Sequence, residues 1–357
     1  MIDVLKLLRE LSEAPGVSGY ESPVCAIAQA ALSPVADTLS TDALGNLIAI
    51  KRGTQAGEPR RSIMLAAHMD EIGLIVSAQE GSFLRFATVG GVDLRTVVGQ
   101  EVTVHGCRDL PGIIASRPPH VLTPEERAQP VPLDKLYIDT GLSEQALQQA
   151  VQVGDLVTMR RRVTELAGGY VSGKAMDDRA GVVSLAVCLD TLKTMTHFWD
   201  VYAVITTQEE VGLKGAGVSA YRVAPDLGVA VDVGFGRQPG LPETRVIDMD
   251  GGPAVAMGPN IHPAFRARLM DLAHRLEFKV QSEVMAGASG TDGWAIQVAR
   301  EGVPTLVLSI PLRYMHTSVE TVCLRDIERT GRLLAHLIAD LDEHAAAELL
   351  GAEGAPA

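Results

Sequence analysis

Apolar runs and amphipathic stretches alternate over most of the chain. Short apolar runs bounded by polar residues, Gly or Pro predict buried strands at residues 46–51, 62–68, 201–207, 226–233, 278–284 and 304–310. Apolar residues at helical spacing predict helices at residues 1–14, 22–32, 178–193, 262–277, 291–300 and 324–345. This alternation predicts an α/β fold, a three-layer α/β/α domain with a mixed, mostly parallel sheet.

Local signals refine two of these segments. In the second predicted helix, Ser22 is a plausible N-cap, and Pro23 stands at the first helical position, where its missing N–H is tolerated. The last residues, "HAAAELLGAEGAPA" (344–357), are rich in Ala, Glu and Gly, and we expect them to fray.

The pattern changes over residues 72–160. Short alternating segments such as "GSFLRFATVG", "QEVTVHG" and "LPGIIAS" are separated by Gly and Pro, which is typical of a small β-barrel or sandwich. We therefore predict that 72–160 form a β-rich domain inserted into an α/β domain made of 1–71 and 161–357. A chain of 357 residues is long for a single compact domain, which agrees with two domains.

Composition and charge restrict the partners. The formal charge of −13 argues against nucleic acid or an anionic membrane, since both attract a basic face. No apolar run reaches the roughly 18–20 residues of a membrane span. The four cysteines are far apart and form no CxxC pair, which indicates free thiols in a reducing compartment. We expect a soluble, cytoplasmic protein.

The predicted strands end in residues that bind metals. Ligands of open α/β sheets bind beyond the carboxyl ends of the strands, and five segments here end in His68 with Asp70, Asp177 with Asp178, Glu209 with Glu210, Asp232, and His316. Imidazole and carboxylate suit Zn²⁺, Co²⁺ or Mn²⁺. Each feature alone has an ordinary explanation, because acids at strand ends are often solvated and a lone His is usually structural. Five such coincidences on one sheet favour a metal site.

Charge balance separates the roles of the two adjacent glutamates. Asp177, Glu210 and Asp232, with one hydroxide, neutralise two divalent cations, while His68 and His316 stay neutral. Glu209 is then free to act as a general base that takes a proton from the attacking water. Adjacent residues of a strand point to opposite faces, so both glutamates can share a site only after the strand has ended.

Several motifs resemble one known family. "APGVSGYE", "AAHMDEIG", "GKAMDDRAG", "QEEVGLKGA", "SGTDGWAIQ" and "IPLRYMHTSVE" match, in order and spacing, the TET-type dinuclear metalloaminopeptidases, which include glutamyl and deblocking aminopeptidases. The resemblance covers nearly the whole chain. It implies a metal-dependent aminopeptidase that uses a water activated by two metal ions, Zn or Co with Mn as the alternative, to remove N-terminal residues from short peptides with a free N-terminus.

The resemblance also implies roles for single residues. His68 and Asp232 would hold one metal, Glu210 and His316 the other, and Asp177 would bridge the two. Glu209 would be the general base, and Asp70 would hydrogen-bond His68 and fix its tautomer. A cis peptide bond is expected between Asp177 and Asp178. The inserted domain would serve dimerisation and assembly, so that a homo-oligomer is expected, with dimers assembling to a dodecamer.

Some alternatives stay open at this stage. A dimetal site of this kind also suits a dipeptidase, carboxypeptidase or deacylase, and, less well, a glycanase or a non-catalytic assembly subunit. The chain departs from the family pattern in "SGTDG" and "DVGFGRQPG", near loops 234–242 and 285–295 that we expect to line the substrate pocket. Arg237 and Arg313 could favour an acidic substrate side chain, although a surface or packing role is the simpler interpretation of each.

Overall fold

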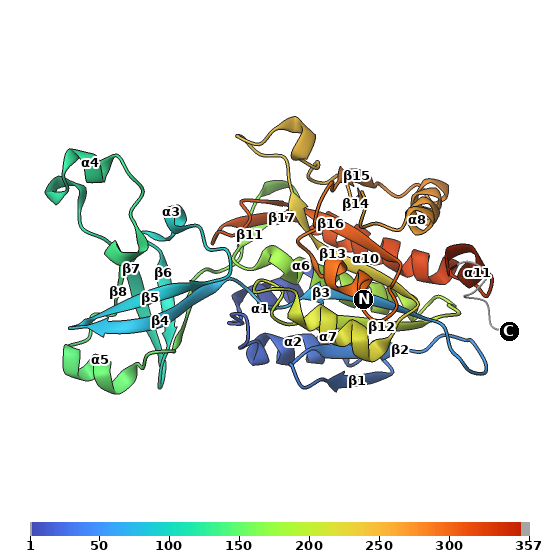
Figure 1. The fold of residues 1–357 in the computed structure, drawn as a ribbon, viewed down its shortest axis with the longest axis horizontal. Coiled ribbons are helices and arrows are strands. Elements are labelled where there is room, and N and C mark those ends of the chain that lie inside the picture. The colour runs from blue at the N-terminus through green and yellow to red at the C-terminus, as the bar shows by residue number, and fades with distance from the viewer. Residues whose placement is uncertain (1, 351–357) are drawn as a thin grey trace.

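The computed structural model describes residues 2–350, which form an α/β domain and a smaller β-barrel that projects from it (Figure 1). The barrel is built from one continuous stretch of chain, while the α/β domain is built from the segments before and after it. The fold class predicted from the sequence, an α/β layer structure plus a small β-rich unit, is confirmed. The domain boundaries at residues 71/72 and 160/161 stay predictions.

The α/β domain is organised around an 11-stranded mixed sheet. Its strands are β1 (Thr38–Thr41), β2 (Leu47–Lys51), β3 (Ser62–His68), β10 (Thr164–Glu165), β11 (Tyr170–Gly173), β12 (Asp200–Thr206), β13 (Leu227–Phe235), β14 (Ala254–Met257), β15 (Gln281–Val284), β16 (Thr305–Arg313) and β17 (Glu320–Cys323). The main path runs β1-β2-β12-β3-β13-β16-β17-β11-β10, and β14 and β15 branch from β16. Parallel pairing is concentrated in the four central strands, β12-β3-β13-β16, with antiparallel strands on either side.

Helices cover both faces of this sheet, since all seven residues of β3 are buried. The helices of the domain are α1 (Val4–Glu13), α2 (Ser22–Leu32), α6 (Met176–Leu192), α7 (Lys214–Val223), α8 (Pro263–Arg275), α9 (Asp292–Gln297), α10 (Leu324–Asp340) and α11 (Ala345–Leu350), with short 3-10 turns at Ala167–Gly169 and Glu243–Arg245. The almost wholly buried α6 packs on β3 and β13 and is covered by α1 and α10, while α7 and α9 form a second group on β12 and β13.

The inserted unit is a closed antiparallel barrel with the order β4-β5-β8-β7-β6-β9. Its elements are β4 (Gly73–Glu80), β5 (Phe83–Val89), α3 (Leu94–Val97), β6 (Glu101–His105), β7 (Asp109–Ala115), a 3-10 turn (Pro119–Val121), α4 (Pro124–Arg127), a second 3-10 turn (Leu133–Lys135), β8 (Tyr137–Asp139), α5 (Glu144–Ala150) and β9 (Leu156–Met159). β9 closes the barrel by pairing with β4. Alternate residues of β6 and β7 face a separate apolar core.

Two local predictions need correction. The helix α2 begins at Ser22 itself, so Glu21 takes the N-cap position and Ser22 caps nothing. The tail does not fray over 345–350, because α11 buries Ala345, Ala346 and Leu349 against the domain. The remaining part of that predicted tail, 351–357, lies outside the described residues.

Two further features concern the cysteines and the lengths of the helices. The four cysteines, Cys25, Cys107, Cys188 and Cys323, are free thiols. Within residues 2–350, no helix has both the length and the apolar character needed to cross a membrane.

Candidate active site

The predicted site residues meet at the carboxyl ends of the central parallel strands. His68 is the last residue of β3, Glu209 and Glu210 follow β12, and Asp232 lies on β13. β12 and β13 flank β3 in the sheet, and neighbouring strands lie roughly 5 Å apart. Four side chains from three distant parts of the sequence are therefore brought to one edge of the sheet.

Asp177 lies between the two histidines. Its Oδ1 is 3.1 Å from His68 Nε2, and its Oδ2 is 3.5 Å from His316 Nε2, in the loop between β16 and β17. Burial alone would raise the pKa of the Asp177 carboxyl, but the contacts with His316 and His68 lower it on balance. The Asp177–Asp178 peptide bond is cis, as the resemblance implied.

The two adjacent glutamates share the site because the strand ends before them. β12 stops at Thr206, and Gln208 has the left-handed value φ = 55° that breaks the alternation of side chains. Glu209 Oε2 then lies 3.9 Å from His68 Nε2, and Glu210 Oε1 lies 3.6 Å from His316 Nε2. Each glutamate thus faces a different histidine.

Asp70 supports this arrangement from a fully buried position behind it. Its carboxylate accepts hydrogen bonds from the backbone N–H groups of Glu209 (3.0 Å) and Glu210 (3.2 Å) and from the Ser18 hydroxyl (2.6 Å). His68 Nδ1 contacts the backbone carbonyl of Asp70 at 3.2 Å, while the carboxylate lies 3.5 Å away. The carboxylate expected to orient His68 therefore also fixes the loop that carries both glutamates.

The acids of the site repel one another in a buried environment. Burial and neighbouring carboxylates raise the pKa of Glu209 to about 10 and that of Glu210 to about 7, and they raise the pKa of Asp232 well above its usual range. The charge of His68 only partly offsets these shifts. Such a cluster fits divalent cations, which would supply the missing positive charge.

Ligand atoms gather in two groups with mutual distances within 4.8 Å, namely His68, Glu209 and Asp232, and His68, Asp177 and Glu210. Carboxylate and imidazole donors of this kind suit Zn²⁺, Co²⁺ and Mn²⁺. His68 belongs to both groups, and Glu209 belongs to one of them. The donor set therefore fits metal ions, while the expected division of ligands between two ions stays a prediction.

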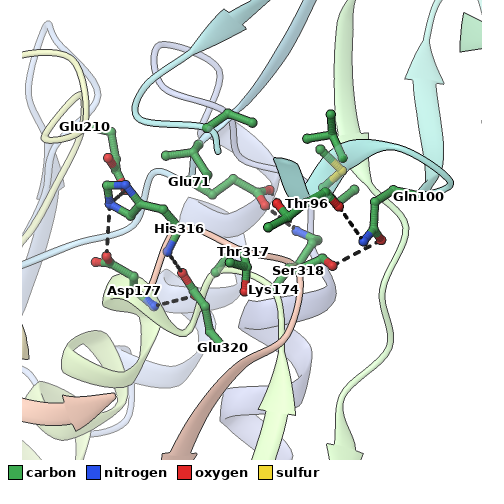
Figure 2. Close-up of a pocket in the computed structure, with 15 residues that line it drawn as sticks. Glu71, Thr96, Gln100, Lys174, Asp177, Glu210, His316, Thr317, Ser318 and Glu320 are labelled. Atoms are coloured by element: carbon green, nitrogen blue, oxygen red, sulfur yellow. Dashed lines mark hydrogen bonds and ion pairs between the residues drawn. The ribbon is translucent and has the colours of Figure 1, made fainter. Parts of the chain in front are cut away.

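Sequence reasoning missed Glu320, which holds two site residues by their backbones. Its carboxylate, buried at the start of β17, accepts hydrogen bonds from the N–H of His316 (2.8 Å) and of Asp177 (3.2 Å), as Figure 2 shows. The signal was available, because Glu320 closes the matched motif "RYMHTSVE".

A buried ion cluster next to the site was also missed. Lys174 Nζ lies 2.7 Å from Glu71 Oε2, and Arg179 lies 3.3 Å from Glu71 Oε1. Burial lowers the pKa of Lys174 to about 8, against the opposing effect of Glu71. The cluster ties the residue after Asp70 to the segment that leads into Asp177.

A family model described as M42 glutamyl aminopeptidase matches residues 45–333. The chain belongs to the M42 glutamyl aminopeptidase family. It is an aminopeptidase, a hydrolase of peptide bonds, and the predicted resemblance is confirmed.

Relatives of this M42 enzyme align with it almost end to end. The lysyl aminopeptidase of Pyrococcus furiosus is 34% identical over 94% of this chain and 97% of its own. The TET aminopeptidase of the archaeon Thaumarchaeota archaeon SCGC AB-539-E09 is 34% identical, with a TM-score of 0.90 over 95% of this chain and 96% of that chain. A TET peptidase of Pyrococcus horikoshii that can assemble into a tetrahedron or a large octahedral shell is 31% identical, with a TM-score of 0.82 over 95% of this chain and 100% of that chain.

The M42 site opens into a cavity of ≈ 400 Å³. Besides the site residues, the cavity is lined by parts of the loops expected to surround the substrate, including Phe235, Met285, Ser289 and Thr291. Arg237 and Arg313 do not line it. Arg237 pairs with Glu243 and Asp248, and Arg313 donates to the Arg237 carbonyl and stacks on Tyr170.

Three other histidines lie outside the site of the M42 fold. His105 pairs with Asp109 in the barrel, His262 caps α8, and His120 lies in the arm that carries α4.

Proposed function

We propose that this M42 enzyme removes N-terminal residues from short peptides by using two divalent metal ions and Glu209 as the general base. The observation that carries the proposal is the contact of one buried carboxylate, Asp177, with both His68 and His316. A carboxylate with a histidine on each oxygen has the arrangement expected of a group shared by two metal ions.

We assign the ions to His68, Asp177, Glu210, Asp232 and His316, with Zn or Co as the metals and Mn as the alternative. Bound divalent ions supply Lewis acidity, which lowers the pKa of a water and polarises the peptide carbonyl. The chain itself supplies the geometry, since Asp70 and Glu320 fix the backbones that carry four of the site residues.

Glu209 moves the proton in this proposal. It accepts a proton from the attacking water and returns it to the nitrogen of the leaving amine, so the peptide C–N bond breaks with no net proton change at the enzyme. Its pKa of about 10 in the protein alone reflects burial and neighbouring acids. Cations beside it would lower that pKa towards neutral pH, where a general base is most effective.

The substrate class, the assembly and the location are proposed from three separate observations. The free α-amine of the peptide is the group that distinguishes an aminopeptidase substrate, and two relatives are named for different residues, as a lysyl and a glutamyl aminopeptidase. We propose dimers that assemble to a dodecamer, because related TET peptidases form large shells. Four free cysteines suit the cytoplasm.

The test compares the wild-type enzyme with Glu209→Gln on aminoacyl anilides with free or acetylated α-amines. After chelation, added Co²⁺ or Zn²⁺ should restore cleavage of the free-amine series alone. Glu209→Gln should retain two metal ions per subunit, measured by elemental analysis, and lose about 10²- to 10⁴-fold in kcat.

The exposed Glu301→Gln serves as the matched control and should behave as the wild-type enzyme. Full activity of Glu209→Gln would remove the base assignment. If Glu209→Gln instead lost one metal ion, Glu209 would be a metal ligand, as its place beside His68 and Asp232 allows. Cleavage of acetylated substrates would favour the deacylase alternative.

A further inference from the structure

A carboxylate that the chemistry does not use faces the substrate cavity. Glu283, on β15, lines the same cavity of ≈ 400 Å³ as Glu209 and Asp232. Its Oε2 accepts a hydrogen bond of 2.5 Å from the hydroxyl of Ser309. Ser309 is fully buried on β16 and is paired in register with Asp232 on β13. The hydrogen bond therefore holds the carboxylate of Glu283 beside β16, the strand next to the one that carries Asp232.

This carboxylate has no cationic partner among residues 2–350. Its one hydrogen bond comes from the neutral Ser309, and no Lys or Arg lines the cavity. The arginine bonded to the adjacent residue is engaged elsewhere, since Arg266 donates to the Ser282 hydroxyl and to the Ala256 carbonyl. Burial raises the pKa of Glu283, and the Ser309 hydroxyl opposes that shift. A half-buried acid of this kind is stabilised by a cation that arrives with a ligand.

Part of the lining of this cavity suits an aliphatic chain. Phe235, Met285 and Met315 line the cavity with apolar surface. Gly234 keeps the approach to Glu283 open, because a Cβ there would lie 3.3 Å from Oε1 and 2.9 Å from the Ser309 Cβ. A cavity that combines these apolar side chains with the carboxylate of Glu283 suits a side chain with a long methylene stem and a terminal positive charge.

We propose that Glu283 selects peptides whose N-terminal residue is lysine or arginine, by binding the positive charge at the end of that side chain. The proposal rests on the proposed aminopeptidase function, since it assigns Glu283 to the substrate side chain of the same site. It is a specificity-determining residue and takes no part in proton transfer.

The kinetic test measures kcat/KM of the metal-loaded enzyme for Lys-, Arg-, Met- and Leu-anilides. We expect the wild-type enzyme to favour Lys and Arg, and Glu283→Gln to lose roughly 10- to 100-fold on these two substrates with little change on Met and Leu. Ser309→Ala, which keeps the acid but releases it from its hydrogen bond, should give a smaller loss of the same kind. Glu301→Gln is again the control.

Two kinetic outcomes would overturn the proposal. An equal loss of Glu283→Gln on all four substrates would place the carboxylate at the α-amine that they share. If Glu283→Gln kept the wild-type ratio of kcat/KM for Lys- and Leu-anilides, Glu283 would have no role in recognising the substrate side chain.

A binding measurement separates this proposal from the catalytic one. L-lysine and L-norleucine differ in the terminal ammonium, so calorimetry should show that the wild-type enzyme binds lysine at least roughly tenfold more tightly. Glu283→Gln should abolish that difference. Equal affinities in the wild-type enzyme would contradict the proposal even if peptides are cleaved, whereas the expected difference in an inactive enzyme would reject only the aminopeptidase mechanism.

Discussion

His68 and His316 face the two oxygens of Asp177, but the protein holds them in different ways. His68 ends a fully buried strand, its side chain is 2% exposed, and its Nδ1 contacts the carbonyl of Asp70, two residues along the chain. His316 lies in a loop. Its backbone has φ = 61°, and its side chain is 33% exposed. Its Nδ1 contacts the carbonyl of Gly91, in the inserted domain, 225 residues away.

In both cases the contact at Nδ1 favours a proton on that nitrogen and leaves Nε2 free for a metal ion. His68 is held by a contact at the end of its own strand. The position of His316 depends on a contact from the inserted domain, the carbonyl of Gly91. The comparison teaches that the inserted domain takes part in the site, because the Gly91 carbonyl contacts His316.

The largest effect on metal affinity should come from a change next to His68. Asp70→Asn replaces a carboxylate that accepts from two backbone amides and a hydroxyl with a group that has a single acceptor oxygen. We expect metal affinity to fall about 10- to 100-fold, measured by titrating the apo-enzyme with Zn²⁺ in competition with a chelator. The exposed Asp271→Asn is the control, and unchanged affinity in Asp70→Asn would mean that His68 needs no support from this carboxylate.

A smaller effect on metal affinity should come from a change next to His316. A Cβ at Gly91 would lie 2.6 Å from His316 Nδ1, so Gly91→Ala must push the imidazole away. The backbone should accept the change, because Gly91, unlike Gly90 with φ = 74°, is outside the left-handed region. We expect a loss in metal affinity of roughly tenfold with an unchanged circular dichroism spectrum.

Gly217→Ala, whose new Cβ would lie 3.9 Å from the Cβ of Ala295, is the matched control for this change. If Gly91→Ala bound metal as the wild-type enzyme does, the contact between the barrel and His316 would have no role in holding the site.

The difference between the two histidines also explains what the sequence could predict. His68, Glu209, Glu210 and Asp232 were found because an apolar run marks where a strand ends and residue type marks the ligand. Gly91 could not be found in this way. It acts through a carbonyl oxygen and through the lack of a side chain, neither of which is a signal in a single sequence.

The fold shows the same limit. Alternating residues predicted the strands of the inserted domain, but its closure depends on the pairing of β9 with β4, which no local pattern encodes. Helix content was predicted from spacing, whereas the cap of α2 was misplaced by one residue because Glu21, which accepts from the Gly19 N–H, occupies the N-cap position. Contacts between distant segments are what the sequence leaves open.

The smallest effect on metal affinity should come from removing the hydrogen bond that joins the two domains beside the site. The Ser318 hydroxyl donates to Gln100 Oε1 at 3.1 Å (Figure 2). Ser318→Ala should reduce the free energy of unfolding by about 0.5–1.5 kcal/mol, measured by urea denaturation, and leave metal affinity within about twofold of the wild-type value. If metal affinity fell as far as in Gly91→Ala, the orientation of the whole barrel, rather than the single contact at Gly91, would hold His316 in place.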